Sequence, residues 1–147
     1  MSLNKILVPI DGSDASFRAL NLAVELGEKF GSELLLLCVY RHHSPLEASL
    51  SMVHSYASQK PDEAMSDYAK QLVEKAKQHA ASTGALKIRG FIENGQPARS
   101  IVDFADKHSV DLIAMGSRGI GDIGGFLLGS VSHKVTSLAK CACLTVK

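Results

Sequence analysis

Five short apolar runs alternate with four helical patterns along this chain, and that alternation limits the possible folds more than any other feature. Strands are predicted at residues 3–10, 33–39, 86–92, 112–115 and 143–146. Several runs, most plainly the four leucines at residues 34–37, are nearly continuous in Leu, Ile and Val, which is typical of strands covered on both faces. The pattern βαβαβαβαβ favours a parallel sheet with right-handed crossovers. We therefore expect an α/β fold, and the length suits one domain over residues 1–147.

Apolar residues recur at helical spacing between these runs. The four stripes are Ala19, Leu22, Ala23, Leu26 and Phe30; Tyr68, Leu72, Ala76 and Ala80; Ala98, Ile101, Val102 and Ala105; and Val131, Val135, Leu138 and Ala139. Gly31 is expected to end the first helix, Pro61 precedes the second and Gly84 follows it, and Gln96-Pro97 opens the third.

Charge and composition exclude several classes of partner. Lys and Arg number 16 against 15 acidic residues, without a basic run, so nucleic-acid binding is not expected. The chain has no run near the roughly 20 apolar residues that span a bilayer. The first residues lack a basic segment followed by an apolar signal core. We expect a cytoplasmic protein with no membrane partner.

Cysteine and histidine offer two candidate metal sites, and neither pattern is complete. Cys141 and Cys143 form a C-x-C pair without a second pair at zinc spacing, which favours plain strand cysteines, like Cys38. The irregular segment 40–60 carries three histidines without a carboxylate or cysteine spaced to complete a ligand set. Solvated loop histidines are the preferred interpretation, and metal ligands are the alternative.

Open α/β sheets bind ligands at the carboxyl ends of their strands, so the residues directly after each strand are informative. The first strand is followed by Asp11-Gly12-Ser13-Asp14. Ser13 is predicted to cap the next helix, with Asp14 in its first turn. Asp11 stands at the strand tip, where it either binds a ligand or bonds the backbone of its own turn.

The fourth strand runs into a glycine-rich segment, residues 116–132. Five of the 12 glycines fall between positions 119 and 129, and glycine lets backbone N–H groups approach a ligand closely. A helix predicted to begin at Ser130 presents unpaired N–H groups that favour an anion. Ser130 and Ser132 add hydroxyls, and Arg118 adds a compensating charge. An anion cradle is the preferred hypothesis; a flexible surface loop with a helix capped by Ser130 is the alternative.

Two common phosphate-binding motifs are absent. The sequence contains no G-x-x-x-x-G-K-[ST], and the first strand is followed by D-G-S rather than by G-x-G-x-x-G. No Ser–His–Asp set or paired carboxylates stand out, so the sequence offers binding groups without an evident general base.

Three segments together resemble the universal stress protein family over essentially the whole chain. The family's nucleotide loop, G-x2-G-x9-G-[ST], is matched by Gly116, Gly119, Gly129 and Ser130. The opening I-L-V-P-I-D-G-S at 6–13, the Met115-Gly116 junction and the helix start G-S-V-S at 129–132 are similar to it as well.

The resemblance implies a Rossmann-like fold of the adenine nucleotide alpha hydrolase type, with strand order 3-2-1-4-5 and helices on both faces. It implies ATP as the ligand, with Mg²⁺ held mainly by the phosphates, and a homodimer formed through the last strand, Cys141 to Lys147. The adenine and ribose end is implied to be Pro9, Asp11 and Val39. The residues implied to hold ribose and phosphates are Met115, Gly116, Gly119, Gly129, Ser130, Val131 and Ser132.

The chain departs from the family pattern at three places. His133 replaces the acid of the usual S-V-S-E helix start, Cys141-Ala142 replaces C-P, with Thr145 further along the same strand, and Asp122 adds negative charge to the loop.

Three functions follow from these observations. The preferred one is an ATP-binding regulatory or stress-response protein with an unknown protein partner and slow hydrolysis at most. The alternatives are an enzyme of nucleotide chemistry such as a slow ATPase, and a dimeric interaction module without nucleotide.

Overall fold

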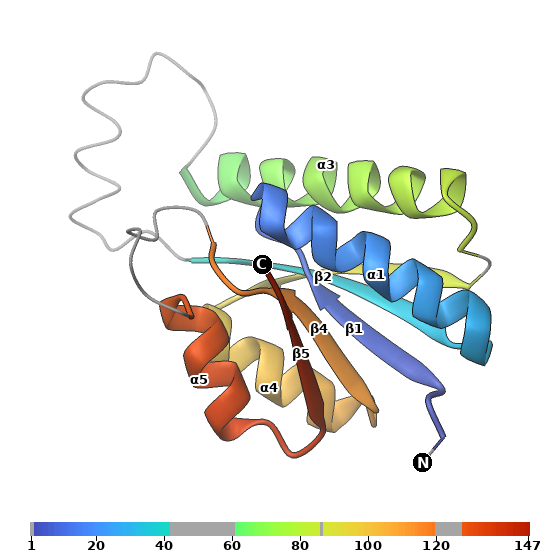
Figure 1. Ribbon diagram of the computed structural model, residues 1–147. Helices are drawn as coiled ribbons and strands as arrows, with labels where there is room; N and C mark the ends of the chain where they lie inside the picture. Colours follow the sequence, from blue (N-terminus) through green and yellow to red (C-terminus); the bar gives the residue numbers. More distant parts are fainter. Residues whose placement is uncertain (1, 42–60, 86, 120–127) are drawn as a thin grey trace.

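The computed structural model describes residues 2–41, 61–85, 87–119 and 128–147. Strands and helices alternate along them, as predicted (Figure 1). In chain order the elements are β1 (Lys5–Pro9), α1 (Asp14–Phe30), β2 (Glu33–Tyr40), α3 (Pro61–Ser82), β3 (Ile88–Asn94), α4 (Pro97–Lys107), β4 (Leu112–Gly116), α5 (Ser130–Leu138) and β5 (Ala142–Val146).

The five strands form one parallel sheet in the order β3-β2-β1-β4-β5. The α/β fold and this strand order are therefore confirmed. β1 lies in the middle, where Leu7 is in register with Leu35 of β2 and Ile113 of β4. The carboxyl ends of β2, β1 and β4 consequently lie side by side at one edge of the sheet.

Helices cover both faces of the sheet, α1 and α3 on one and α4 and α5 on the other (Figure 1). Alternate residues of each central strand enter the two cores, because successive side chains of a strand point to opposite faces. Leu34 and Leu36 of β2 pack toward α1 and α3, whereas Leu35 and Leu37 pack toward α4 and α5. This double coverage explains why the strands are nearly continuous in apolar residues.

The predicted ends of α1 and α4 are confirmed. The Ser13 hydroxyl accepts a hydrogen bond from the Ser16 N–H (3.2 Å), and Gly31 ends α1 in the left-handed conformation at φ 69°. The Gln96 side chain caps α4, which begins at Pro97. These caps fix how each helix leaves the carboxyl end of the preceding strand.

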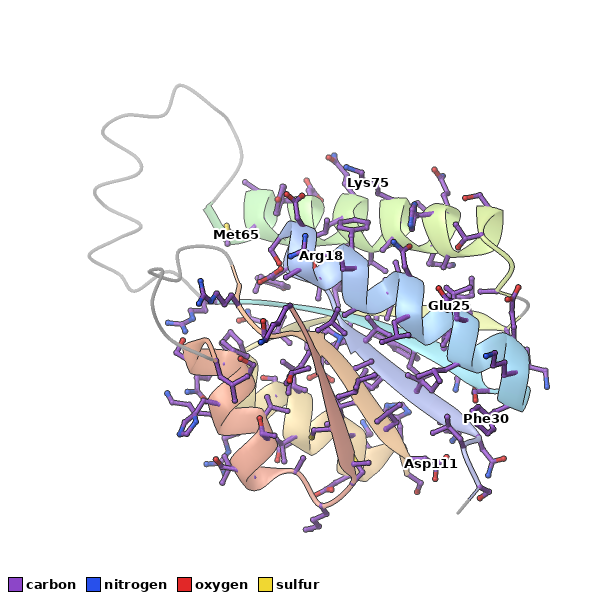
Figure 2. All side chains as sticks on the ribbon, in the orientation of Figure 1. Arg18, Glu25, Phe30, Met65, Lys75 and Asp111 are labelled. Atoms are coloured by element: carbon purple, nitrogen blue, oxygen red, sulfur yellow. The ribbon has the colours of Figure 1, made fainter. Side chains whose placement is uncertain are left out.

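Three of the predicted helical stripes each include one apolar residue that is exposed rather than buried. Phe30, Tyr68 and Leu138 are 62%, 55% and 59% exposed, and Phe30 lies at the far end of α1 (Figure 2). The predicted Leu72, Ala76 and Ala80 of α3 are buried, and Ala69 and Val73 are buried beside them in place of Tyr68. The prediction assigned about one apolar residue to each helical turn, whereas the buried face of the helix is wider than that.

The strand boundaries shift by a few residues from those predicted. β1 begins at Lys5 and ends at Pro9, and β3 runs from Ile88 to Asn94. β2 extends to Tyr40, β4 to Gly116, and β5 begins at Ala142. Backbone pairing with neighbouring strands, which the apolar pattern does not record, sets these limits.

Cysteines and histidines form no metal cluster among the residues that the structure describes. Cys38 lies buried on β2, where burial and then the Asp11 carboxylate raise its thiol pKa to about 11. Burial also raises the thiol pKa of Cys141, just before β5, and of Cys143 within it. The three loop histidines lie outside the described residues, as does Asp122.

No helix in the described ranges is long and apolar enough to cross a membrane.

Candidate functional site

A cleft of about 350 Å³ opens at the carboxyl ends of β1, β2 and β4, where the first turns of α1, α4 and α5 also meet. Sheets of this type bind ligands at this edge. The strand order produces the cleft, because placing β1 between β2 and β4 brings the Asp11 turn beside the glycine-rich segment.

Ten of the eleven residues predicted for the site line this cleft. They are Pro9, Asp11, Val39, Met115, Gly116, Arg118, Gly119, Ser130, Val131 and Ser132. Gly129 does not line it, but its N–H donates to the Ser117 carbonyl at 2.6 Å and so holds the start of α5 against the end of β4. The segment between, residues 120–127, lies outside the described residues.

Sequence reasoning missed several lining residues, chiefly at the β2 end of the cleft. Leu37 precedes Val39 on the same face of β2, and Arg41 follows it. Pro97 and Ile101 come from the first turns of α4. Gln96-Pro97 was recognised only as a helix start, and the tertiary position of α4 over β2 has no local sequence signal.

The Asp11 turn has a clear structural role. One carboxylate oxygen of Asp11 accepts hydrogen bonds from the Ser13 N–H (2.9 Å) and the Ser13 hydroxyl (2.5 Å). Gly12 between them has φ 88°, a conformation that favours glycine. Asp11 therefore bonds its own turn, as the structural alternative predicted. The same exposed side chain lines the cleft, so the turn also holds a carboxylate where a ligand can meet it.

The first turn of α5 differs from those of α1 and α4 in its cap. Its N-cap is Gly129, which makes no side-chain capping bond, and like α4 it holds no acidic residue in its first turn. Ser130 is the first helical residue rather than the cap, which corrects the alternative reading of this serine. α1 and α4 are capped by side chains of Ser13 and Gln96. Within the described residues, the positive end of α5 thus faces the cleft without a capping side chain.

Ser132 fastens the two ends of the glycine-rich segment together. Its buried hydroxyl oxygen lies 2.8 Å from the Ser117 carbonyl and 3.1 Å from the Gly129 carbonyl, and its proton is shared between these acceptors. The Ser117 N–H in turn donates to the Val146 carbonyl of β5 at 2.7 Å. The hydroxyl expected to reach a ligand therefore serves the backbone, and Ser132 positions the amides of α5.

Replacing Ser132 with alanine is expected to lower the free energy of unfolding by about 0.5–1.5 kcal/mol, because the Ser117 and Gly129 carbonyls each lose one of their two donors. Urea denaturation followed by circular dichroism measures this. Ser137→Ala is the matched control, since the Ser137 hydroxyl donates to the His133 carbonyl on the exposed side of the same helix. Equal stability of the two variants would contradict the positioning role.

The two ends of the cleft differ chemically. The β4 and α5 end presents Gly116, Gly119 and the first residues of α5, and Arg118 also lines this end. The β2 and α4 end is walled by Leu37, Val39, Pro97 and Ile101. An elongated ligand with an anionic end and a flat apolar end fits both, because amides and guanidinium groups favour anions whereas the aliphatic wall favours apolar surface.

Comparison with known proteins identifies the family. The model of the universal stress protein family matches residues 2–147. Universal stress protein YxiE of Bacillus subtilis is 39% identical over 147 residues, which cover 98% of this chain and 99% of that protein. Universal stress protein UspA from Lactobacillus plantarum superposes with a TM-score of 0.83 at 28% identity, covering 100% of this chain and 99% of that one. A universal stress protein solved in complex with cAMP gives a TM-score of 0.73 at 25% identity, covering 99% and 98%. The chain belongs to the universal stress protein family.

Proposed function

We propose that this protein binds ATP in the cleft and acts as a nucleotide-dependent regulatory protein of the stress response, with slow hydrolysis at most. One observation carries the proposal: the start of α5, which has no side-chain cap, opens into the same cleft as the aliphatic wall of β2 and α4. The triphosphate would lie against the α5 amides and Arg118, and the adenine against Val39 and Pro97.

The relative solved with cAMP supports an adenine nucleotide as the ligand class. Two features of this chain favour a triphosphate over a cyclic monophosphate. The amides of α5 and the Arg118 guanidinium are grouped at one end of the cleft, and a triphosphate brings more negative charge to them. Mg²⁺ would be held mainly by the phosphates.

The proposal also includes a homodimer formed through β5. This strand pairs with β4 on one side and ends the sheet, so its other edge can pair with a second copy. Ala142, at the start of β5, is exposed. Sedimentation velocity measures the mass, and a monomer at micromolar concentration would contradict this part.

Isothermal titration of the nucleotide-free protein with Mg·ATP tests the proposed function. We expect a dissociation constant in the micromolar range, weaker binding of cAMP, and phosphate release slower than a few turnovers per minute. Mass spectrometry of material that copurifies with the protein should identify an adenine nucleotide. No binding at millimolar Mg·ATP would refute the proposal. Fast turnover would favour the enzymatic alternative instead.

A further inference from the structure

Arg41 lies at the end of the cleft opposite to the α5 amides. Leu37 and Val39 line the cleft from one face of β2, and Arg41 follows two residues after Val39 and lines it as well. Gly116, Arg118 and Ser130 line the other end, beyond β4. Since β1 lies between β2 and β4, two inter-strand spacings of about 4.8 Å separate the two ends.

This separation argues against a phosphate-binding role for Arg41. A phosphate held at the start of α5 would lie about 10 Å or more from the tip of β2. A guanidinium group that stays near the tip of β2 would lie about one Debye length from that phosphate at physiological ionic strength, where the attraction between exposed charges is weakened. Arg41 is therefore placed to contact the other end of a nucleotide.

The cleft offers no aromatic ring for the base to stack on: in the described part of the chain, its lining contains no Phe, Tyr, Trp or His. Val39, Pro97 and Ile101 supply aliphatic contacts. Among the described lining residues, guanidinium groups come from Arg41 and Arg118, and Arg118 belongs to the β4 end. A guanidinium group is flat and weakly hydrated, and it stacks on aromatic faces.

We propose that Arg41 stacks its guanidinium group on the base of the bound nucleotide and closes the β2 end of the cleft. The inference rests on the proposed function, because it assumes that the ligand is a nucleotide with its phosphates at α5. It makes Arg41 a determinant of affinity for the nucleoside part of the ligand.

The test measures the affinity of wild type, Arg41→Ala and Arg41→Lys for two ligands, Mg·ATP and adenosine. Displacement of a fluorescent ATP analogue gives both affinities. Arg41→Ala is expected to lower the affinity for both ligands by the same factor, about 3- to 30-fold. Arg41→Lys keeps the charge but loses the plane, so it should not restore binding. Arg99→Ala is the matched control: it removes an exposed guanidinium from α4 that does not line the cleft, and should bind both ligands as wild type does.

Each other outcome overturns the inference in a distinct way. A loss confined to ATP would assign Arg41 to the phosphates, and full restoration by lysine would mean that charge alone matters. Unchanged affinity in Arg41→Ala, or failure of adenosine to compete in wild type, would exclude stacking. All of these presuppose that wild type binds Mg·ATP; if it does not, the proposed function itself fails.

Discussion

Ser130→Glu is expected to lower the affinity for ATP more than about 100-fold while leaving the protein folded. Ser130 is the exposed first residue of α5 and lines the cleft. A carboxylate there would lie near the proposed phosphate position, and two unit charges 4 Å apart repel by about 4 kcal/mol at an effective dielectric constant of 20. Isothermal titration with Mg·ATP measures the loss.

The same substitution is expected to stabilise the protein without nucleotide. The first turn of α5 lacks an acidic residue, and a carboxylate at a helix N-terminus contributes about 0.3–1 kcal/mol. A variant that is more stable than wild type but binds ATP more weakly would therefore identify the N-terminus of α5 as the anion site. Ser137→Glu, in the last turn of α5, makes the same charge change away from the cleft and should leave the affinity unaltered. Undiminished ATP binding by Ser130→Glu would place the phosphates elsewhere.

Ser130→Pro separates the role of the amide from that of charge. Proline is tolerated at the first helical position, where its missing N–H has no intrahelical partner. Gly129 before it is already extended, at φ −71° and ψ 169°, as a residue preceding proline prefers. We expect Ser130→Pro to bind ATP more weakly than Ser130→Ala, because only the former removes a backbone donor.

The fold was predictable because burial on both faces leaves a direct trace in the sequence. Residues 34–37 are all leucine because alternate members enter different cores. Apolar patterns do not record which strands are neighbours, however. The central place of β1 was predicted only through the family resemblance, and it is this placement that brings Asp11 to the glycine-rich segment.

The candidate site was predictable where local backbone chemistry requires particular residues. Glycine spacing and the helix start at Ser130 marked the α5 end because close backbone approach and open amides depend on short sequence segments. The β2 end was largely missed, since Ile101 joins it only through the packing of α4, and Arg41 follows β2 outside any recognised motif. Sequence also does not tell which way a hydroxyl points, and Ser132 bonds the backbone rather than facing outward.

Gly116→Ala is expected to destabilise the protein by about 1–3 kcal/mol and to weaken ATP binding as well. Gly116 ends β4, and a Cβ there would lie 2.8 Å from the Ala15 Cβ and 2.9 Å from the Ala15 carbonyl carbon. Neither atom belongs to a flexible side chain, so the first turn of α1 must move. That turn follows the Asp11 and Ser13 loop, which lines the cleft. Thermal and urea denaturation measure the stability, and Mg·ATP titration measures the affinity.

Gly27→Ala is the matched control for this steric argument. A Cβ at Gly27, inside α1, would meet the flexible Leu34 side chain at 3.4 Å, an ordinary contact. Removing a glycine from a helix interior favours folding by roughly 0.5–1 kcal/mol, so Gly27→Ala should be at least as stable as wild type.

Combining Gly116→Ala with Ala15→Gly removes the Cβ–Cβ contact and leaves the contact with the carbonyl carbon. The double variant should therefore recover part of the lost stability, giving a coupling energy of about 0.5 kcal/mol or more. Additive effects of the two substitutions would show that α1 and β4 do not press against each other at this position.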